Sequence, residues 1–206
     1  VQGEGGVFPA TQEFMEGIRK LCDEKGIMFL LDEVQAGWGR CGAFMCYQTY
    51  GVKPDGVSMA KAMGGGMPIA AVAATNELAS AFTPGSHGST YAGHPVACAA
   101  SLAQLREMKR IDAPANAKKV GDYFAAELAK MPHVKAVRHR GLFVGVELED
   151  GINAVEVKHH CIDNHLLVTA IGANIIRMVP PLIIRGVDCD VAVERLSKAI
   201  NEVAGK

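Results

Sequence analysis

The feature that most constrains the fold is the short apolar run IMFLLDE, residues 27–33, which directly follows a segment with helical periodicity. In that preceding segment, residues 11–26, apolar side chains recur at helical spacing, and Gly26 provides a helix stop. A continuous apolar run is typical of a buried strand in a parallel sheet. The pattern therefore predicts an α/β fold with Asp32 and Glu33 at the carboxyl end of a strand, where open α/β sheets bind ligands.

The remaining pattern divides the chain into two parts. Up to residue 115, the predicted elements are strands at 56–60 and 69–75, a capped helical segment at 76–82 and a helix at 95–110. Beyond it they are a helix at 116–131, antiparallel strands within 134–149, a helix at 153–165, strands near 166–170 and 174–179, and a closing helix at 190–203. We therefore predict an α/β domain with a parallel sheet in residues 1–115 and a smaller α+β domain in residues 116–206.

Composition is that of a globular protein and excludes several classes of function. The 206 residues are 49% hydrophobic and 21% charged, which is enough apolar material for a substantial core. A net charge of −1 gives no electrostatic footprint for nucleic acid or a membrane surface. The apolar runs are too short to span a bilayer. The start, VQGEGGVFPA, has no basic segment before an apolar one, so we predict no signal peptide.

The cysteines and histidines give no sign of a metal site. Six cysteines are spread along the chain without a CxxC pair, which predicts reduced thiols in a cytoplasmic protein. The stretch KHHCIDNH, residues 158–165, groups three histidines without an accompanying metal motif. We interpret it as a solvated helix face and predict no bound metal.

Lys61 stands in SMAKAMGGGMPIAA, residues 58–71, which contains no acidic residue. Apolar surroundings disfavour the charged form of a lysine and favour the neutral amine, which attacks aldehydes. Pyridoxal phosphate (PLP) is a cofactor that uses such a lysine together with a carboxylate at its pyridinium nitrogen. Asp32, at the end of a strand, suits that pairing. Alone, each has an ordinary alternative: a surface-loop lysine, and a helix N-cap or turn aspartate.

Five segments, two of which contain Asp32 and Lys61, support the combination. They are VQGEGG (1–6), LLDEVQAGWGRCG (30–42), SMAKAMGGGMPIAA (58–71), GSHGSTYAGHPVACAA (85–100) and NIIRMVPPLII (174–184). In this order the chain resembles the class III, or ω-, aminotransferases of PLP-dependent fold type I. The stretch LLVTAIGANIIRMVPPLII is most similar to the acetylornithine and succinylornithine members. The resemblance implies the C-terminal half of such an enzyme, with residues 1–115 forming part of the large PLP-binding domain and 116–206 the small domain.

The resemblance also implies roles for residues around the cofactor. Lys61 would form a Schiff base with PLP and then move a proton between substrate and cofactor. Asp32 would pair with the pyridinium nitrogen. Val34 would pack against one face of the ring, and Gln35 would lie near its phenolic oxygen.

Further roles concern phosphate and substrate. Thr90, aided by Ser89, resembles the residue that binds cofactor phosphate in the neighbouring subunit, which implies a homodimer. Arg177 resembles the arginine that binds a substrate carboxylate through its planar fork. Glu4 resembles the gate glutamate, which pairs with that arginine while an ω-amine is bound and swings away for 2-oxoglutarate. The alternatives are an exposed strand arginine and a loop acid.

Two positions depart from the family pattern without touching its chemistry: Cys41 replaces a threonine, and His94 stands where asparagine is common before Pro95. The family's N-terminal half, with a phosphate-cradling loop and a ring-stacking aromatic, has no counterpart in these residues.

The resulting hypothesis is transfer of an amino group from an N-acetylornithine-like donor to 2-oxoglutarate, a step of arginine biosynthesis. Ornithine and 4-aminobutyrate aminotransferases share every motif above and remain alternatives. An aminomutase or decarboxylase would also keep Lys61 and Asp32. A non-enzymatic reading also stays open, in which this stretch has no activity by itself and at most self-associates.

Overall fold

The computed structural model describes residues 1–205 and contains two compact units. The N-terminal unit consists of Ala10–Gly39 and Ala43–Ala113, and the C-terminal unit consists of Val1–Pro9, Arg40–Gly42 and the chain from Pro114 onward. Two short segments from early in the sequence therefore pack with the C-terminal residues. The domain limits expected from the family, 1–115 and 116–206, stay a prediction.

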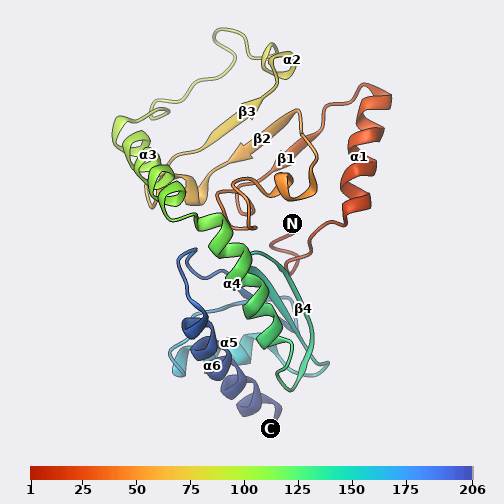
Figure 1. Ribbon diagram of the computed structural model, residues 1–206, viewed down its shortest axis with the longest axis vertical. Helices are drawn as coiled ribbons and strands as arrows, with labels where there is room; N and C mark the ends of the chain where they lie inside the picture. The colour runs from red at the N-terminus through yellow and green to blue at the C-terminus, as the bar shows by residue number, and fades with distance from the viewer. Residues whose placement is uncertain (206) are drawn as a thin grey trace. The chain divides into compact units, whose positions relative to one another are not determined.

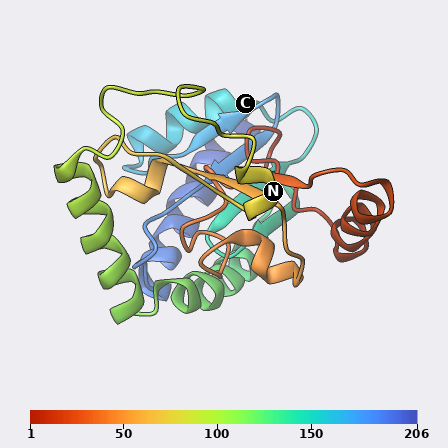
Figure 2. The same cartoon turned by 90° about the horizontal axis from the view of Figure 1, so that it is seen from above.

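The N-terminal unit is built around a three-stranded sheet in the order β1-β2-β3 (Figure 1). Its elements are α1 (Gln12–Lys25), β1 (Leu30–Asp32), the 3-10 helix η1 (Cys46–Tyr50), β2 (Gly56–Met59), the 3-10 helix η2 (Lys61–Gly64), β3 (Ala71–Ala74), α2 (Asn76–Ala79) and α3 (Pro95–Arg110). Figures 1 and 2 show α1 on the β1 side of this sheet and α3 on the opposite side.

The ends of α1 follow from local chemistry. The Thr11 side chain accepts a hydrogen bond from Phe14 N, which satisfies one of the free donors in the first turn. At the other end Gly26 adopts φ 64°, a left-handed conformation that glycine takes at little cost, and its N–H bonds back to the last turn. The predicted helix at 11–26 is confirmed.

The expectation of a parallel sheet is correct for only one of the two strand pairs. β1 and β2 run parallel, whereas β2 and β3 run antiparallel. The connection from Met59 to Ala71 is short and contains only η2 as regular structure. A parallel return needs a crossover of about a dozen residues or more, usually a helix, so this connection favours an antiparallel return.

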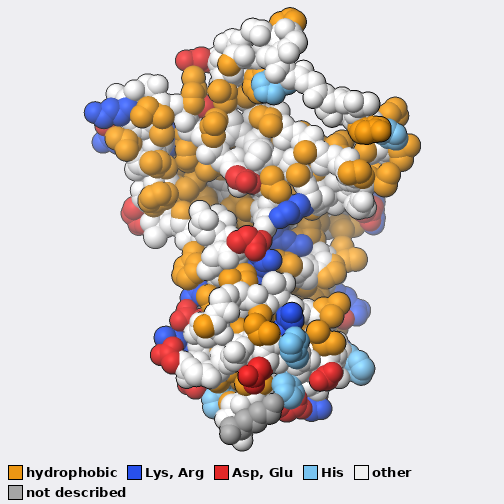
Figure 3. Space-filling model, turned by 180° about the vertical axis from the view of Figure 1, so that it is seen from behind, with side chains coloured by type: hydrophobic (Ala, Val, Ile, Leu, Met, Phe, Trp, Pro, Cys, Tyr) orange, Lys and Arg blue, Asp and Glu red, His pale blue; other side chains and the backbone are white. Residues whose placement is uncertain are grey.

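The burial expected for β1 is not found within the described residues. Leu30 is 59% exposed, and on β3 Val72 is 65% exposed. Figure 3 shows many apolar side chains over the part of the surface formed by the N-terminal unit. The prediction was wrong because an apolar run indicates only that a strand is suited to burial. The helices or strands that would cover it are other segments, which the run does not specify.

The C-terminal unit contains a four-stranded antiparallel sheet in the order β4-β5-β7-β6. Its elements are α4 (Ala113–Leu128), β4 (Val134–Arg140), β5 (Phe143–Leu148), α5 (Ala154–Asp163), β6 (Thr169–Ile171), β7 (Ile175–Met178) and α6 (Gly186–Ala204). The predicted strands and helices are all present. α4 begins earlier than predicted because Pro114, which lacks an N–H, is tolerated in a first turn.

One face of this sheet forms a closed core with the three helices. Val144, Val146 and Leu148 alternate along β5 and are fully buried, as is Ile176 on β7. Phe124 of α4 belongs to the same cluster and is also fully buried. Residues two apart on a strand point to one face, so the intervening positions of β5 and β7 face the other side.

That second face is covered by the segment Val1–Pro9. A side chain at Gly145 would place its Cβ 2.6 Å from Gly6 O and 3.0 Å from Val7 Cβ, so the segment lies directly on β5. Val7 itself is fully buried. In residues 1–205, no helix combines the length and the hydropathy that a membrane span requires.

Candidate active site

Asp32 and Lys61 lie at the same end of the β1–β2 pair. In the parallel register Asp32 lies opposite Ser58, and Lys61 begins η2 just past the end of β2. Glu33 N donates to Ser58 O at 3.0 Å, which extends the pairing beyond Asp32. Because parallel strands end at one edge of a sheet, the predicted acid and amine share this edge.

The chain after Asp32 is held by a local turn. Val34 N donates to Asp32 Oδ1 at 2.9 Å, the side-chain to backbone bond of an Asx turn. A carboxylate has lone pairs for several bonds, so Asp32 can accept a ligand N–H and keep this turn. The Asp32 side chain is exposed, and Val34 and Gln35 follow it half-buried.

Lys61 is held in a backbone conformation that lysine rarely adopts. Its φ is 41°, at the first position of η2. A non-glycine residue in this region carries a strain of about 1–3 kcal/mol, and such strain gathers at functional sites. The conformation therefore favours a functional role for Lys61 over the ordinary surface-loop alternative.

The apolar surroundings expected for Lys61 are not found within the described residues. Lys61 is exposed, and so are its neighbours Ala62, Met67 and Pro68. Three glycines, Gly64–Gly66, follow it and bring no side chains to enclose the amine. The sequence correctly predicted apolar neighbours along the chain, but neighbours in sequence do not by themselves form an enclosure in space.

Glu33 is a site residue whose role the sequence did not reveal. It is 5% exposed, and its carboxylate accepts bonds from Cys46 N at 2.5 Å and Tyr47 N at 2.6 Å, the first amides of η1. Burial raises the pKa of the Glu33 carboxyl, and these two backbone N–H groups oppose the rise. Glu33 thus ties the chain that leaves β1 to η1. The only signal in the sequence was an acid at the end of an apolar run.

The predicted phosphate-binding residues lie apart from regular structure. Ser89 and Thr90 are in the exposed segment between α2 and α3. Their predicted contribution to a neighbouring subunit's site stays a prediction.

The C-terminal unit brings the two predicted substrate residues together. Arg177 Nη1 and Glu4 Oε1 form an ion pair of 2.8 Å, although 173 residues separate them in sequence. The Arg177 side chain is 13% exposed and the Glu4 side chain 72%. Among the described residues Arg177 Nε is buried without a hydrogen-bond partner. The guanidinium thus presents Nη1 to Glu4, while its Nε is shielded from solvent.

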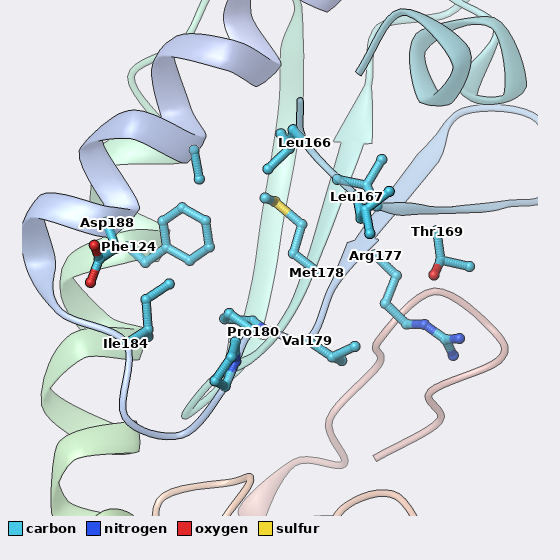
Figure 4. A pocket seen from close by; sticks show the side chains of 13 residues that line it. Phe124, Leu166, Leu167, Thr169, Arg177, Met178, Val179, Pro180, Ile184 and Asp188 are labelled. Atoms are coloured by element: carbon cyan, nitrogen blue, oxygen red, sulfur yellow. The ribbon is translucent and has the colours of Figure 1, made fainter. Parts of the chain in front are cut away.

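A pocket of about 480 Å³ lies beside Arg177 in the same unit. Its wall is mainly apolar, with Phe124, Met178 and Ile184 among its lining residues. Figure 4 shows the guanidinium of Arg177 pointing away from these apolar side chains. Arg177 therefore stands at the rim of the pocket. In the described part of the chain, no group of three His, Cys, Asp or Glu side chains is arranged to hold a metal ion.

Comparison with known families gives one match over nearly the whole chain. The family model described as "Aminotransferase class-III" matches residues 1–200. The acetylornithine aminotransferase of Caldanaerobacter subterraneus subsp. tengcongensis is 41% identical over 98% of this chain and 52% of its own length. The ornithine aminotransferase 2 of Staphylococcus aureus is also 41% identical, over 95% of this chain and 50% of its own length.

Solved structures agree with these sequence matches. Acetylornithine aminotransferase from Elizabethkingia anophelis superposes with a TM-score of 0.90 at 33% identity, covering 98% of this chain and 52% of that one. Plasmodium falciparum ornithine δ-aminotransferase gives a TM-score of 0.93 at 32% identity, covering 100% and 54%. The chain thus spans about half the length of the relatives that it matches.

Proposed function

Because this chain belongs to the class III aminotransferase family, we propose that it acts in the transfer of an amino group from an N-acetylornithine-like ω-amino donor to 2-oxoglutarate. Class III aminotransferases depend on PLP, and the fold is that of PLP-dependent fold type I. The pair of side chains at the β1–β2 edge and the Glu4–Arg177 pair support the proposal.

The residues at the strand edge fit PLP by their chemistry. An amine and a carboxylate at one edge correspond to the two groups that PLP requires, one for its aldehyde and one for its ring nitrogen. When bound, PLP supplies an electron sink for the bond-breaking at the substrate carbon. Lys61 Nζ would hold the aldehyde carbon and carry a proton to and from the reacting centre. Asp32 would keep the ring nitrogen protonated.

The neighbouring residues would complete the cofactor site. Val34 would pack on the ring and Gln35 would lie near its phenolic oxygen. Ser89 and Thr90 would bind phosphate in the neighbouring subunit of a homodimer, since hydroxyl and backbone N–H groups suit phosphate oxygens. We place this homodimer in the cytoplasm, in arginine biosynthesis.

The observation that carries the proposal is the Glu4–Arg177 ion pair. Arg177 can bind a carboxylate of 2-oxoglutarate bidentately once Glu4 has moved away. While Glu4 is paired with Arg177, the positive charge of the arginine is neutralised. A donor that enters with its ω-amine first then needs no carboxylate to pair with Arg177. One site can thus accept two substrates of different charge in turn.

The proposal also specifies which amino donor the enzyme uses. Relatives of equal identity are named acetylornithine and ornithine aminotransferase, so ornithine is the second candidate donor. A single polar contact separates two such substrates by only a few kcal/mol or less, and donor contacts need not all lie in this chain.

The test is a set of amino-transfer assays. PLP should change the visible absorbance of the protein, and 2-oxoglutarate should be converted to glutamate faster with N-acetylornithine than with ornithine. Lys61→Ala should abolish both the absorbance change and glutamate formation. An unchanged absorbance together with no glutamate from either donor would favour the non-enzymatic alternative.

A further inference from the structure

Arg138 lies in one register row with Arg177 across the C-terminal sheet. Arg138 of β4 pairs with Gly145 of β5, and Gly145 pairs with Arg177 of β7. Directly paired residues of antiparallel strands point to the same face. The two arginines therefore flank Gly145 on the face that the segment Val1–Pro9 covers.

The N-terminal segment that lies over Gly145, between the two arginine side chains, is a closed loop. Gln2 N donates to Phe8 O at 2.9 Å, and Phe8 N donates to Gln2 O at 3.2 Å. We call the enclosed residues, Gln2–Phe8, the gate loop because they carry Glu4. Gly145 lets the backbone of the gate loop lie on the sheet, since a Cβ there would lie 2.6 Å from Gly6 O.

Arg138 contacts the gate loop at Phe8 and Gly6, whereas Arg177 contacts it at Glu4. Its guanidinium carbon lies 4.1 Å from the centroid of the Phe8 ring, well inside the range of a cation–π contact. Its Nε also reaches Gly6 O at 3.4 Å, a long and weak hydrogen bond. The ring contact is therefore the stronger hold on the loop.

The orientation of Arg138 is itself fixed. Nη1 pairs with Glu147 Oε2 at 2.5 Å, and the two side chains are 17% and 22% exposed. Nη2 is buried without a hydrogen-bond partner among the described residues. Leaving a buried donor unpaired is unfavourable, so stability alone is a poor explanation for an arginine here.

We propose that Arg138 is a positioning residue for the Glu4–Arg177 gate: by holding Phe8 and Gly6 it keeps the gate loop where Glu4 meets Arg177, and so sets the selectivity between an ω-amino donor and an α-amino acid. The proposal rests on the proposed function of Arg177 and Glu4. It assigns Arg138 no contact with substrate or cofactor.

The first experiment compares donors in the PLP-loaded enzyme. Arg138→Met keeps an unbranched apolar stem but removes the charge and the fork of the side chain. The ratio of kcat/KM for N-acetylornithine to that for glutamate should fall roughly three- to fivefold, which is the scale of one partly exposed cation–π contact. Glu4→Gln should lower the same ratio. Adding Arg138→Met to Glu4→Gln should lower it no further, because both changes remove one interaction.

Lys135→Met is the matched control. Lys135 lies on the same strand and also pairs with Glu147, at 3.5 Å, and with Asp150 at 3.2 Å. Its substitution should leave the donor ratio unchanged. If Lys135→Met lowers the ratio as much as Arg138→Met, the effect arises from general weakening of β4 and the proposal is wrong.

A second measurement does not depend on activity. In PLP-free protein, hydrogen exchange at the amides of Gln2 and Phe8 should be faster in Arg138→Met than in wild type or Lys135→Met. Should Arg138→Met fail to fold, Phe8→Leu provides the same tests from the other side of the contact, since Phe8 is 44% exposed.

The outcomes separate this inference from the proposed function. A wild-type enzyme that transfers amino groups but whose donor ratio and loop exchange are unaltered by Arg138→Met overturns the role of Arg138 and leaves the function standing. Additive effects of Glu4→Gln and Arg138→Met overturn it as well. A wild type that transfers no amino group from either donor overturns the proposed function, and the gate with it.

Discussion

The two compact units differ in how completely they bury their apolar side chains. In the C-terminal unit one cluster joins three helices to the sheet, and Phe124, Val146 and Leu196 within it are fully buried. In the N-terminal unit the strands are thinly covered, and Leu30 and Val72 are each more than half exposed. The unit with the closed core carries the Glu4–Arg177 pair, whereas the open unit carries Lys61 and Asp32.

This difference separates the unit that supplies most of the apolar burial from the unit that holds Lys61 and Asp32. A closed core supplies most of the free energy of unfolding, because apolar burial is the main favourable term in folding. The open sheet instead presents apolar surface of the kind found at interaction sites. Lys61 and Asp32 therefore lie where the described residues give little enclosure.

The largest effect is expected from Lys61→Ala in the open unit. Loss of the amine should lower kcat for amino transfer by at least about 10²–10⁴-fold, the usual contribution of a positioned acid–base group. The midpoint of thermal unfolding of the PLP-free protein should hardly change, since Lys61 is exposed. A large drop in that midpoint would break the separation of chemistry from stability.

Phe124→Ala tests the closed core. It should lower the free energy of unfolding by about 3–5 kcal/mol, because it leaves a cavity in a well-packed cluster. Leu30→Ala in the open unit is the control and should cost no more than about 0.5 kcal/mol.

The two units can be followed separately in that measurement. Trp38 is the single tryptophan and lies in the N-terminal unit, so its fluorescence reports that unit, while circular dichroism reports both. Phe124→Ala should move the circular-dichroism transition further than the Trp38 transition. Equal shifts would show that the two units unfold as one.

Glu33→Gln tests the one buried anchor at the open edge. The amide can accept a bond at only one of its two positions, so one of the amides of Cys46 and Tyr47 loses its acceptor. At neutral pH the free energy of unfolding should fall by about 1–3 kcal/mol. Chemical denaturation of wild type and variant provides the measurement.

The difference in stability between wild type and Glu33→Gln should depend on pH, and the pKa of Glu33 gives the direction. The folded-state pKa of Glu33 is raised, so the folded protein binds this proton more readily than the unfolded chain does. The part of the free energy of unfolding that depends on binding this proton is fully present below the ordinary glutamate value of 4.5 and is lost as the pH rises through the folded pKa, whereas the two hydrogen bonds to Cys46 N and Tyr47 N remain. The wild-type advantage over Glu33→Gln should therefore shrink as the pH rises above 4.5. An advantage that grows over this range would contradict it.

The smallest effect is expected from releasing the strain at Lys61. Its φ of 41° is costly for a residue with a Cβ and easy for glycine. Lys61→Gly should therefore be more stable to heat than Lys61→Ala, by up to about 1 kcal/mol. Two variants of equal stability would show that the backbone there relaxes without cost.

Features that depend on neighbours in sequence were predicted well. Thr11 and Gly26 mark the ends of α1 through bonds within a few residues. The antiparallel pairing of β4 and β5 follows from alternation across a tight turn. The family could be recognised because its motifs stand in order along the chain, and the match over residues 1–200 confirms it.

Features that depend on residues far apart in the sequence were not predicted well. The direction of β3, the exposure of β1 and the exposure of Lys61 were each wrong or unforeseen, because a strand pattern does not state what will cover it. The anchoring of Glu33 depends on amides in η1, which no local pattern connects to the end of β1.

By itself the sequence determined the fold class, the two halves of different character, the family and the residues Lys61, Asp32, Arg177 and Glu4 as candidates. These follow from local propensity, periodicity and ordered motifs. Only the tertiary structure decided that Glu4 meets Arg177 across 173 residues, and that Arg138 lies in register with Arg177 on the face beneath the gate loop. Such contacts are set by strand pairing and close approach at Gly145, where geometry rather than residue type selects the partner.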